Sequence, residues 1–208
     1  KEVHLMQQIR PHSNVVQFLG VCMDPLMLVT EFLERGSLYH FLRKEEAANL
    51  TQAQTQDIIK GIASGMYHLA SEGIVHRDLA ARNILLSAAL VPKISDFGMS
   101  RLVQQESGHV TSSSVGPLKW MAPENLLDRI YSEKSDVWSF GVTCIEILTR
   151  KDPYPNMEGV QVATRVGNKG LTPEIPENCP AQLATMLVGC FKFDPAERPD
   201  FKSIFESL

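Results

Sequence analysis

The eight residues at positions 76–83 constrain the fold of this chain more than any other segment. They place a base, cations and an amide metal ligand in a single loop, and they read His76-Arg77-Asp78-Leu79-Ala80-Ala81-Arg82-Asn83. Two shorter motifs follow, Asp96-Phe97-Gly98 and then Ala122-Pro123-Glu124. Chance matches do not accumulate in a fixed order, so the three motifs together indicate one defined architecture.

The bulk composition indicates a globular chain. Its 208 residues are 44% hydrophobic, enough for one substantial core, and no apolar run approaches the ~20 residues of a membrane-spanning helix. The formal net charge of -4 gives no basic footprint, so we expect no nucleic-acid partner and no membrane contact from this segment. Four scattered cysteines without a Cys-x-x-Cys pair favour reduced thiols and an intracellular, cytoplasmic protein.

Hydrophobic periodicity predicts a short β-containing part followed by a long helical part. Residues 1–10 have apolar positions at helical spacing and indicate the end of an amphipathic helix. The apolar runs at 15–21 and 26–32, separated by a turn, predict a β-hairpin. The further elements expected are a short helix after Ser37, a long helix from Thr51 to near Gly73, strands at 84–86 and 91–94, a helix from Ser132 or Glu133, and helices near 158–166, 181–191 and 200–208.

Three details of these segments carry further expectations. Gly61 and Gly65 indicate close packing of the long helix against a neighbouring segment. The helix that begins at Ser132 or Glu133 is apolar on most faces, so we expect it at the buried centre of the helical part. The polar stretch at 98–117 is expected to be a functional loop without regular structure.

The order and approximate spacing of the three motifs resemble those of protein kinases, and in particular tyrosine kinases and their tyrosine-kinase-like relatives. The resemblance covers nearly the whole chain and implies an α+β, kinase-like fold. It makes residues 1–33 a remnant of the small lobe, with the end of a helix, two strands and the hinge, and residues 34–208 the mostly helical large lobe. The sequence contains no G-x-G-x-x-G loop and no V-A-I-K lysine.

The resemblance assigns the chemistry to two loops. Asp78 is expected to accept or orient the proton of the substrate hydroxyl, and Asn83 and Asp96 are expected to bind Mg²⁺ beside the phosphates of ATP. A lone Asp and Asn in a loop more often form a turn that satisfies itself, but the complete set of motifs favours the catalytic role.

The acceptor implied by the resemblance is tyrosine. Serine/threonine kinases usually have a lysine two residues after the catalytic aspartate, whereas this chain has Ala80 and offers a cation at Arg82, as tyrosine kinases do. The segment 117–120, Pro-Leu-Lys-Trp, resembles the platform against which a tyrosine ring packs.

The nucleotide and small-lobe contacts are also carried over by resemblance. Thr30 corresponds to the gatekeeper, the backbone at Glu31 and Leu33 to the hinge that bonds adenine, and Leu85 to the floor beneath the ring. Glu2 corresponds to the helix glutamate that pairs with the strand lysine of an active kinase. Side chains expected to stack into a column joining the two lobes are Met6, Phe18, His76 and Phe97.

Regulation is expected in the segment after Asp96. It contains no tyrosine between 98 and 117, so a phosphate that pairs with Arg77 would sit on serine or threonine. The alternative is that these residues form only a solvated loop. The candidate positions are Ser107, Thr111, Ser112, Ser113 and Ser114.

Three more residues resemble architectural positions of the large lobe. Glu124 and Arg198 are expected to form a buried ion pair. Asp136, at the start of the apolar helix, is expected to bond the backbone of the turn at residues 76–78.

The function implied is transfer of the γ-phosphate of ATP to hydroxyl groups of protein substrates. Tyrosine is the preferred acceptor, and dual specificity for tyrosine and serine/threonine is the second choice. The alternatives are a serine/threonine kinase of the tyrosine-kinase-like group and a pseudokinase that acts as a binding or scaffolding module. Because the Gly-rich loop and the strand lysine are not in the sequence, we expect this chain by itself to bind ATP weakly and to turn over very slowly.

Overall fold

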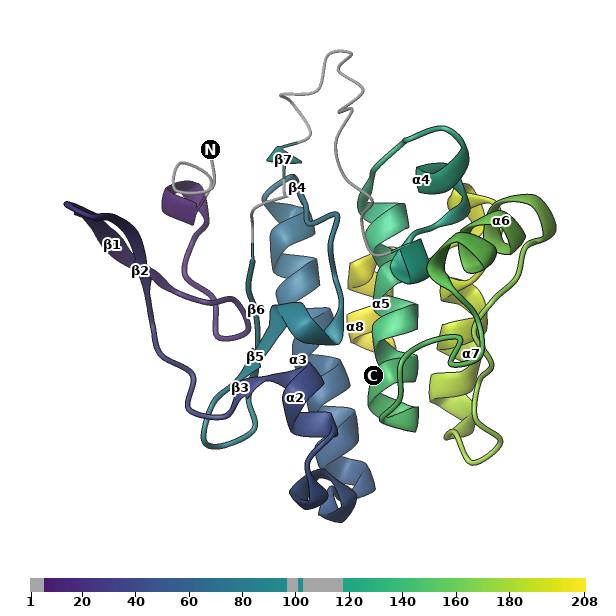
Figure 1. Ribbon diagram of the computed structural model, residues 1–208, viewed down its shortest axis with the longest axis horizontal. Coiled ribbons are helices and arrows are strands. Elements are labelled where there is room, and N and C mark those ends of the chain that lie inside the picture. Colours follow the sequence, from purple (N-terminus) through teal and green to yellow (C-terminus); the bar gives the residue numbers. More distant parts are fainter. Residues whose placement is uncertain (1–5, 97–100, 103–117) are drawn as a thin grey trace.

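The structure is a computed structural model that describes residues 6–96, 101–102 and 118–208 (Figure 1). The described elements are, in chain order, β1 (Phe18–Met23), β2 (Leu26–Thr30), β3 (Gly36–Ser37), α2 (Leu38–Leu42), η1 (Glu45–Asn49), α3 (Gln52–Ser71), β4 (Ile74–Val75), η2 (Ala81–Asn83), β5 (Ile84–Leu86), β6 (Pro92–Ile94), β7 (Arg101–Leu102), η4 (Leu118–Trp120), α4 (Pro123–Leu127), α5 (Glu133–Thr149), α6 (Gly159–Lys169), α7 (Ala181–Cys190), η5 (Pro195–Glu197) and α8 (Phe201–Ser207). Helices dominate and the strands are short, so the expected α+β, kinase-like class is confirmed.

Side-chain caps explain where three of the helices begin. The Ser37 hydroxyl accepts a backbone N–H at the start of α2, and Ser132 does the same for α5. Thr51 and Gln54 form a reciprocal capping box at the start of α3. The expected positions of these helices are confirmed, as are those of α6, α7 and α8.

Helix α5 forms the centre of the helical part. Every residue from 135 to 147 is buried, and Trp138, Phe140 and Val142 have no exposed surface. In Figure 1, α5 runs beside α3, with α6 and α7 on its other side, and α3 and α7 both pack against it. The prediction that this apolar helix lies at the buried centre is therefore confirmed.

The predicted hairpin is present, but its boundaries differ from the prediction. Strands β1 and β2 pair antiparallel from Phe18 with Thr30 to Met23 with Leu26. The first strand begins at Phe18 because Val15 and Val16 are buried against β6, where the Val16 N–H donates to the Ile94 carbonyl at 2.9 Å. The second strand ends at Thr30, two residues before the apolar run does.

Two further small sheets support the loops that carry the motifs. Strands β3, β5 and β6 form one antiparallel sheet, and β4 pairs with β7 in another. The pair β5 and β6 was predicted, whereas β3, β4 and β7 were not. Strand β7 lies inside the polar stretch at 98–117, so the expectation of a loop without regular structure is wrong at residues 101–102.

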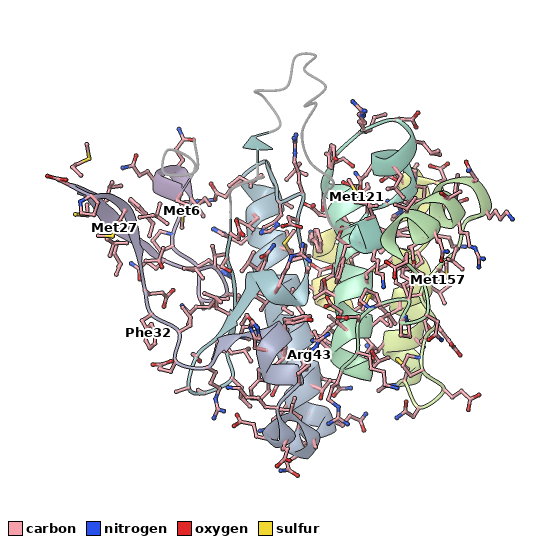
Figure 2. The ribbon with its side chains drawn as sticks, viewed as in Figure 1. Met6, Met27, Phe32, Arg43, Met121 and Met157 are labelled. Atoms are coloured by element: carbon pink, nitrogen blue, oxygen red, sulfur yellow. The ribbon has the colours of Figure 1, made fainter. Side chains whose placement is uncertain are left out.

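The hairpin side of the molecule exposes apolar side chains. Met23 is 79% exposed and Phe32, just after β2, is 83% exposed. Figure 2 shows Met27 on the hairpin and Phe32 pointing away from the helices. Within the described residues, no helix is both long enough and apolar enough to cross a membrane.

Candidate active site

The turn that follows β4 is fixed by one buried carboxylate. Asp136, in the first turn of α5, accepts the N–H of His76 through Oδ2 at 2.7 Å and the N–H of Arg77 through Oδ1 at 2.9 Å. These bonds hold Arg77 at a φ of 71°, in the left-handed region. Burial raises the pKa of Asp136 to about 7, and the two N–H bonds act in the opposite direction. The predicted bond from this aspartate to the turn is confirmed.

His76 joins the two motif loops as a neutral ring. Its Nδ1 accepts the Asp78 N–H at 3.3 Å, so the ring proton is on Nε2, which donates to the Ser95 carbonyl at 3.0 Å. The side chain is fully buried, and this burial lowers the pKa of His76 below its usual value. The loop that carries Asp78 and the loop that precedes Asp96 are thereby held together.

Three predicted catalytic side chains meet at Asp78. Arg82 forms an ion pair with Asp78 Oδ1. The Asn83 amide nitrogen donates to the Asp78 carbonyl at 2.6 Å and to Asp78 Oδ2 at 2.9 Å. The amide nitrogen of Asn83 makes both of these bonds, and its Oδ1 atom accepts no hydrogen bond from another described residue.

Asp96 is brought to the same place through its neighbour. Ser95 donates its N–H and its hydroxyl to the Asn83 carbonyl, both at 2.9 Å. Asp96 itself is exposed and has a φ of 59°. A carboxylate and an amide oxygen are the ligand types that suit Mg²⁺, which usually keeps few protein ligands and shares phosphate oxygens. The described residues contain no group of three or more His, Cys, Asp or Glu residues placed to hold a metal.

The segment predicted to form the acceptor platform is bonded to helix α5. The Trp120 Nε1–H donates to Glu146 Oε2 at 2.7 Å, and the Ser139 hydroxyl donates to the Trp120 carbonyl at 2.8 Å. The guanidinium of Arg82 lies over the Trp120 ring, 5.0 Å from its centroid. The sequence had indicated Trp120 as part of a platform, whereas its motifs did not include Glu146.

The predicted hinge follows strand β2 and has a specific anchor. The Glu31 N–H donates to the Gln17 carbonyl at 3.0 Å, while the Gln17 N–H bonds to the Glu31 carboxylate at 2.8 Å. Lys93 Nζ lies 2.8 Å from the same carboxylate. No described residue donates to the Glu31 carbonyl. Lys93 is a contact that sequence reasoning missed, because it lies on β6, far from Glu31 in the chain.

The other predicted nucleotide residues lie on both sides of this hinge. Thr30 ends β2 and is partly exposed, whereas Leu33 is buried. Leu85 is in the middle of β5, with Ile84 and Leu86 buried on either side and Leu85 itself only half-buried. A partly exposed Leu85 is free to contact a bound ring.

Several predicted residues lie outside the described part of the chain. They are Glu2, Phe97, Ser107, Thr111, Ser112, Ser113 and Ser114. Arg77, the expected partner of a phosphate on one of these serine or threonine residues, is described. Its guanidinium lies 5.0 Å from the centroid of the Tyr131 ring. Of the expected column, Met6, Phe18 and His76 are described. Met6 and His76 are buried, and Phe18 packs against the core.

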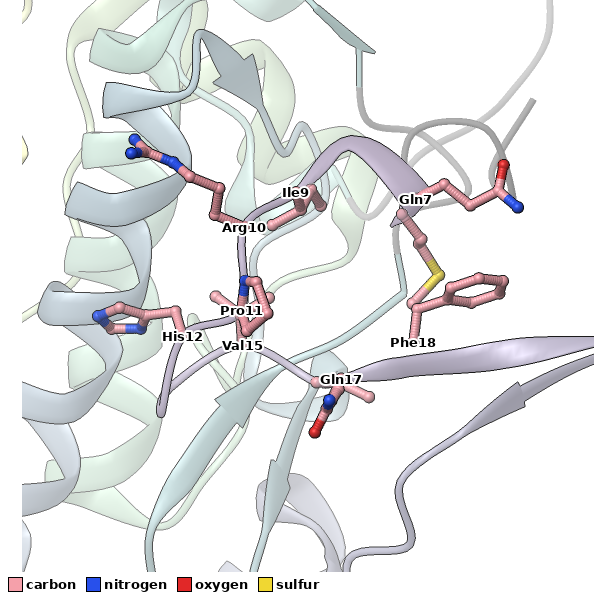
Figure 3. Close-up of a pocket in the computed structure, with 10 residues that line it drawn as sticks. Gln7, Ile9, Arg10, Pro11, His12, Val15, Gln17 and Phe18 are labelled. Carbon is pink, nitrogen blue, oxygen red and sulfur yellow. The ribbon is translucent and has the colours of Figure 1, made fainter.

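A separate pocket of about 340 Å³ lies beside the N-terminal helical turn (Figure 3). Residues from this turn and the segment after it, among them Ile9 and His12, line it together with Phe18 of β1. The predicted nucleotide, metal and catalytic residues do not line this pocket. It is therefore distinct from the site formed by the two motif loops.

The predicted ion pair of the large lobe is present. Arg198 contacts Glu124 through two hydrogen bonds of 2.7 and 2.8 Å, and its side chain has no exposed surface. Its remaining N–H groups donate to the carbonyls of Lys192, Lys134 and Phe193, so all five donors are used. This pair fixes the motif at 122–124 to the segment before α8.

Comparison with known proteins identifies the family. The profile described as protein tyrosine and serine/threonine kinase matches residues 1–208. Tyrosine-protein kinase SRK3 of Spongilla lacustris is 39% identical over 98% of this chain and 61% of its own length. Serine/threonine-protein kinase STY17 of Arabidopsis thaliana is 40% identical over the whole chain, and tyrosine-protein kinase FRK of Homo sapiens is 36% identical over 98% of it.

The chain spans less than two thirds of the length of each of these relatives, 36% of STY17 and 41% of FRK. The relatives include proteins named for tyrosine and for serine/threonine kinase activity. The profile match extends over every residue, and the resemblance found in the three motifs is confirmed. The chain belongs to the protein tyrosine and serine/threonine kinase family.

Proposed function

We propose that the protein transfers the γ-phosphate of ATP to tyrosine hydroxyls of protein substrates, with dual specificity as the closest alternative. Residues 1–33 are assigned to the small lobe and 34–208 to the large lobe. The observation that carries the proposal is the arrangement of Asp78, Arg82 and Asn83. The side chains of Arg82 and Asn83 both bond to the Asp78 carboxylate. Ser95, which directly precedes Asp96, bonds to the Asn83 carbonyl.

Asp78 is assigned as the residue that orients the acceptor hydroxyl and takes its proton. Its carboxylate is held by Arg82 on one oxygen and by Asn83 on the other, so the side chain has a defined direction. Arg82 supplies positive charge where negative charge develops on the transferring phosphate. Positioning and charge compensation are the main contributions that a protein makes to this reaction.

Asn83 and Asp96 are assigned as the metal ligands. The amide orientation of Asn83, with its nitrogen on Asp78, supports this because it leaves an oxygen for a cation. Bound Mg²⁺ would neutralise charge on the β- and γ-phosphates of ATP. The bonds from Ser95 to Asn83 hold the Asp96 loop beside Asn83 in the absence of metal and nucleotide.

The hinge after β2 is assigned to adenine. No described residue donates a backbone hydrogen bond to the Glu31 carbonyl, which supports a role for this carbonyl as an acceptor for the adenine amine. The Leu33 N–H, Thr30 and Leu85 complete the assigned surface. Glu2 is assigned as the partner of a lysine that this sequence does not contain.

Tyrosine is favoured as the acceptor by the residues around Asp78. Ala80 stands where a lysine would contact the phosphate in serine/threonine enzymes, and Arg82 lies over Trp120. An aromatic platform with a cation beside it suits a phenol ring. The relatives carry both tyrosine and serine/threonine names, which is why dual specificity remains the alternative.

Regulation is assigned to Arg77 and the cluster Thr111, Ser112, Ser113 and Ser114. A phosphate there would pair with Arg77 at the turn held by Asp136. We further propose that the 208-residue chain alone transfers phosphate slowly, since its sequence contains neither the Gly-rich loop nor the strand lysine. A cytoplasmic location is assigned because the four scattered cysteines, without a Cys-x-x-Cys pair, favour reduced thiols.

The test uses the full-length protein with Mg²⁺, labelled ATP and four peptides that differ only in having Tyr, Ser, Thr or Phe at one position. We expect label on the Tyr peptide first and none on the Phe peptide. Label on Ser or Thr peptides alone would assign the protein to the serine/threonine group. A protein that labels none of them, with Mg²⁺ and ATP at saturating concentrations, would contradict the enzyme proposal and favour a binding or scaffolding role.

A further inference from the structure

A cavity of about 440 Å³ lies at the C-terminal end of α5. Its walls come from the last turns of α5, the loop between α5 and α6, and the segment 172–176 that follows α6. No described residue that is assigned to ATP, Mg²⁺ or the acceptor proton lines it. The proposed chemistry therefore leaves this cavity without a role.

The lining of the cavity is apolar where it is buried and charged where it is exposed. Ile145, Pro153 and Pro173 are buried, whereas Asp152 and Glu174 are exposed. Cavities of a few hundred Å³ with apolar walls and few polar groups are the usual form of a binding site. An apolar group that enters this cavity would leave water and contact the buried residues.

Four prolines make the walls of the cavity stiff. They are Pro153, Pro155, Pro173 and Pro176. A proline has a fixed φ and no backbone N–H, so these positions change shape little and offer a bound molecule no main-chain donor. A carbonyl group bound against these prolines has to take its hydrogen bond from a side chain.

Tyr154 supplies such a donor. It lines the cavity and is only 9% exposed, and its hydroxyl is buried without a hydrogen-bond partner among the described residues. Burial raises the pKa of Tyr154, so the phenol keeps its proton at neutral pH. Buried polar groups without partners are rare because the cost of removing them from water is not offset. The unpaired hydroxyl therefore points to a bound partner.

The backbone of Tyr154 connects the cavity to the acceptor platform. Its φ of 50° lies in the left-handed region, which a non-glycine residue adopts only where its surroundings impose it. The Tyr154 carbonyl accepts Lys119 Nζ and the Met157 N–H, both at 3.1 Å. Lys119 lies in η4, the segment predicted to pack against the acceptor ring. One wall residue of the cavity is thus bonded directly to the platform.

A second contact joins the cavity to the side of the catalytic loop. Asp152 forms an ion pair with Arg43, the residue that follows α2. Helix α2 packs against η2, which contains Arg82 and Asn83. The cavity therefore borders the acceptor platform and the element that packs on the catalytic loop. This position favours a segment of the protein substrate as the occupant.

We propose that this cavity is a docking site for the protein substrate: it takes an aromatic side chain near the acceptor tyrosine, and the Tyr154 hydroxyl donates to a carbonyl group of the same segment. An aromatic side chain suits the size of the cavity and buries a large apolar area with few rotatable bonds. This inference rests on the proposed function and names a feature of its substrates.

The first experiment locates the docking residue in the substrate. Full-length protein, Mg²⁺ and ATP are combined with peptides that contain one acceptor Tyr and one Phe, which is moved through the positions on both sides of the Tyr in an alanine background. We expect one position, or two adjacent ones, at which Phe raises kcat/KM about tenfold over Ala, mainly through a lower KM for the peptide. Equal values for all peptides would overturn the inference.

A cavity-filling variant connects this preference with the cavity. Met157, on the loop between α5 and α6 (Figure 2), lines the cavity, so Met157→Trp fills it with a ring of the protein's own. We expect the preference for Phe over Ala to fall below about twofold in this variant. A preference that survives in Met157→Trp would place the Phe elsewhere and overturn the inference.

The variant Tyr154→Phe removes only the hydroxyl and should have two opposite effects. The free protein loses a buried hydroxyl that has no partner, so its thermal midpoint should rise by about 2–4 °C. The peptide loses its donor, so affinity for the preferred Phe peptide should fall about fivefold. A merely structural role for Tyr154 would not give a more stable protein that binds its peptide less well.

Tyr67→Phe is the matched control. Tyr67 is 37% exposed on α3 and stacks on Phe205, so loss of its hydroxyl should change neither quantity. Peptide affinity is measured by fluorescence anisotropy without ATP and does not depend on catalysis. Weaker binding in Tyr154→Phe by a protein that transfers no phosphate would locate the failure in the proposed function. Phosphate transfer with equal peptide affinities in wild type, Tyr154→Phe and Met157→Trp would overturn only the inference.

Discussion

At the scale of single residues, the candidate site depends on buried side chains that hold loop backbone in place. Asp136 is the clearest case, because each of its oxygens accepts one N–H from the turn at His76 and Arg77. The substitution Asp136→Asn turns one oxygen into an amide that faces an N–H donor. We expect it to lower the free energy of unfolding by about 3 kcal/mol, measured by urea denaturation.

Asp128 provides the matched control for this prediction. It is an exposed aspartate at the end of α4, and its backbone N–H donates to the Glu124 carbonyl, whereas its carboxylate has no hydrogen bond to another described residue. Asp128→Asn should change stability by less than about 0.5 kcal/mol. Similar stability of the two variants would mean that the two bonds of Asp136 do not hold the turn.

His12 makes a prediction about pH. Its ring stacks on His68 with centroids 4.7 Å apart, and its Nδ1 accepts the Asn14 N–H at 3.1 Å. Burial, then His68 and Lys93, lower the pKa of His12 below its ordinary value of 6.5. A base with a lowered pKa binds more protons when unfolded, so its contribution to stability is lost as pH falls below 6.5.

Comparison with His12→Gln isolates this contribution from other titrating groups. Burial raises the pKa values of Asp136 and Glu146, which gives these groups the opposite dependence on pH. Between about pH 7.5 and about pH 5.5, wild type should lose more stability than His12→Gln, in urea denaturation at both pH values. Parallel losses in the two proteins would show that His12 is not buried in this way in solution.

At the scale of elements, helix α3 packs closely against the segments before β1 and around β6. A Cβ on Gly65 would lie 2.6 Å from the Asn14 carbonyl oxygen and 2.7 Å from Ile94 Cδ1. Alanine favours helices by about 1 kcal/mol over glycine, but overpacking costs about 1–3 kcal/mol. We expect Gly65→Ala to lower the thermal midpoint despite its better helix propensity.

Gly189, near the end of α7, is the matched control. A Cβ there would meet Pro199 at 3.5 Å, an ordinary contact. Gly189→Ala should therefore be neutral or raise stability by up to about 1 kcal/mol. Equal thermal midpoints for the two alanine variants would contradict the close packing described for α3 at Gly65.

The elements also show what the sequence could predict. Local signals were sufficient for the starts of α2, α3 and α5, because Ser37, Thr51 and Ser132 cap the residues that directly follow them. Strand β1 was misplaced because Val15 and Val16 look like strand residues but are buried against β6. The two-residue strands β3 and β4 depend on pairing with distant segments and leave no periodic pattern.

The site divides in the same way. The motifs indicated Asp78, Asn83 and Asp136, and the structure brings the first two into contact and bonds the third to their loop. Glu146 and Lys93 were missed because their partners lie 65 and 62 residues away in the chain. A buried charge on an apolar helix is the one sequence signal that could have indicated Glu146.

At the scale of the whole molecule, the hairpin and the helical part differ in how much structure supports them. Strands β1 and β2 pair mainly with each other, and Met23 is 79% exposed, whereas α5 is buried over most of its length. Two-stranded sheets are at most marginally stable by themselves. We expect the amide protons of β1 and β2 to exchange with solvent much faster than those of α3 and α5.

Hydrogen exchange followed by mass spectrometry on the 208-residue chain measures this difference directly. The Lys93 and Glu31 pair is the hairpin's charged link to β6. Lys93→Met should therefore raise exchange at the end of β2 and leave α5 unchanged. Equal protection of the hairpin and α5 would contradict the unequal support described for them.

The measurement that tests the whole account most directly is phosphate transfer by the full-length wild-type protein and Asp78→Asn, with Mg²⁺·ATP affinity measured on the same samples. Asp78 is assigned to the acceptor proton and not to the nucleotide. The account predicts transfer at least about 100-fold slower in the variant, with nucleotide affinity changed by less than about twofold. Equal transfer rates in the two proteins would contradict it.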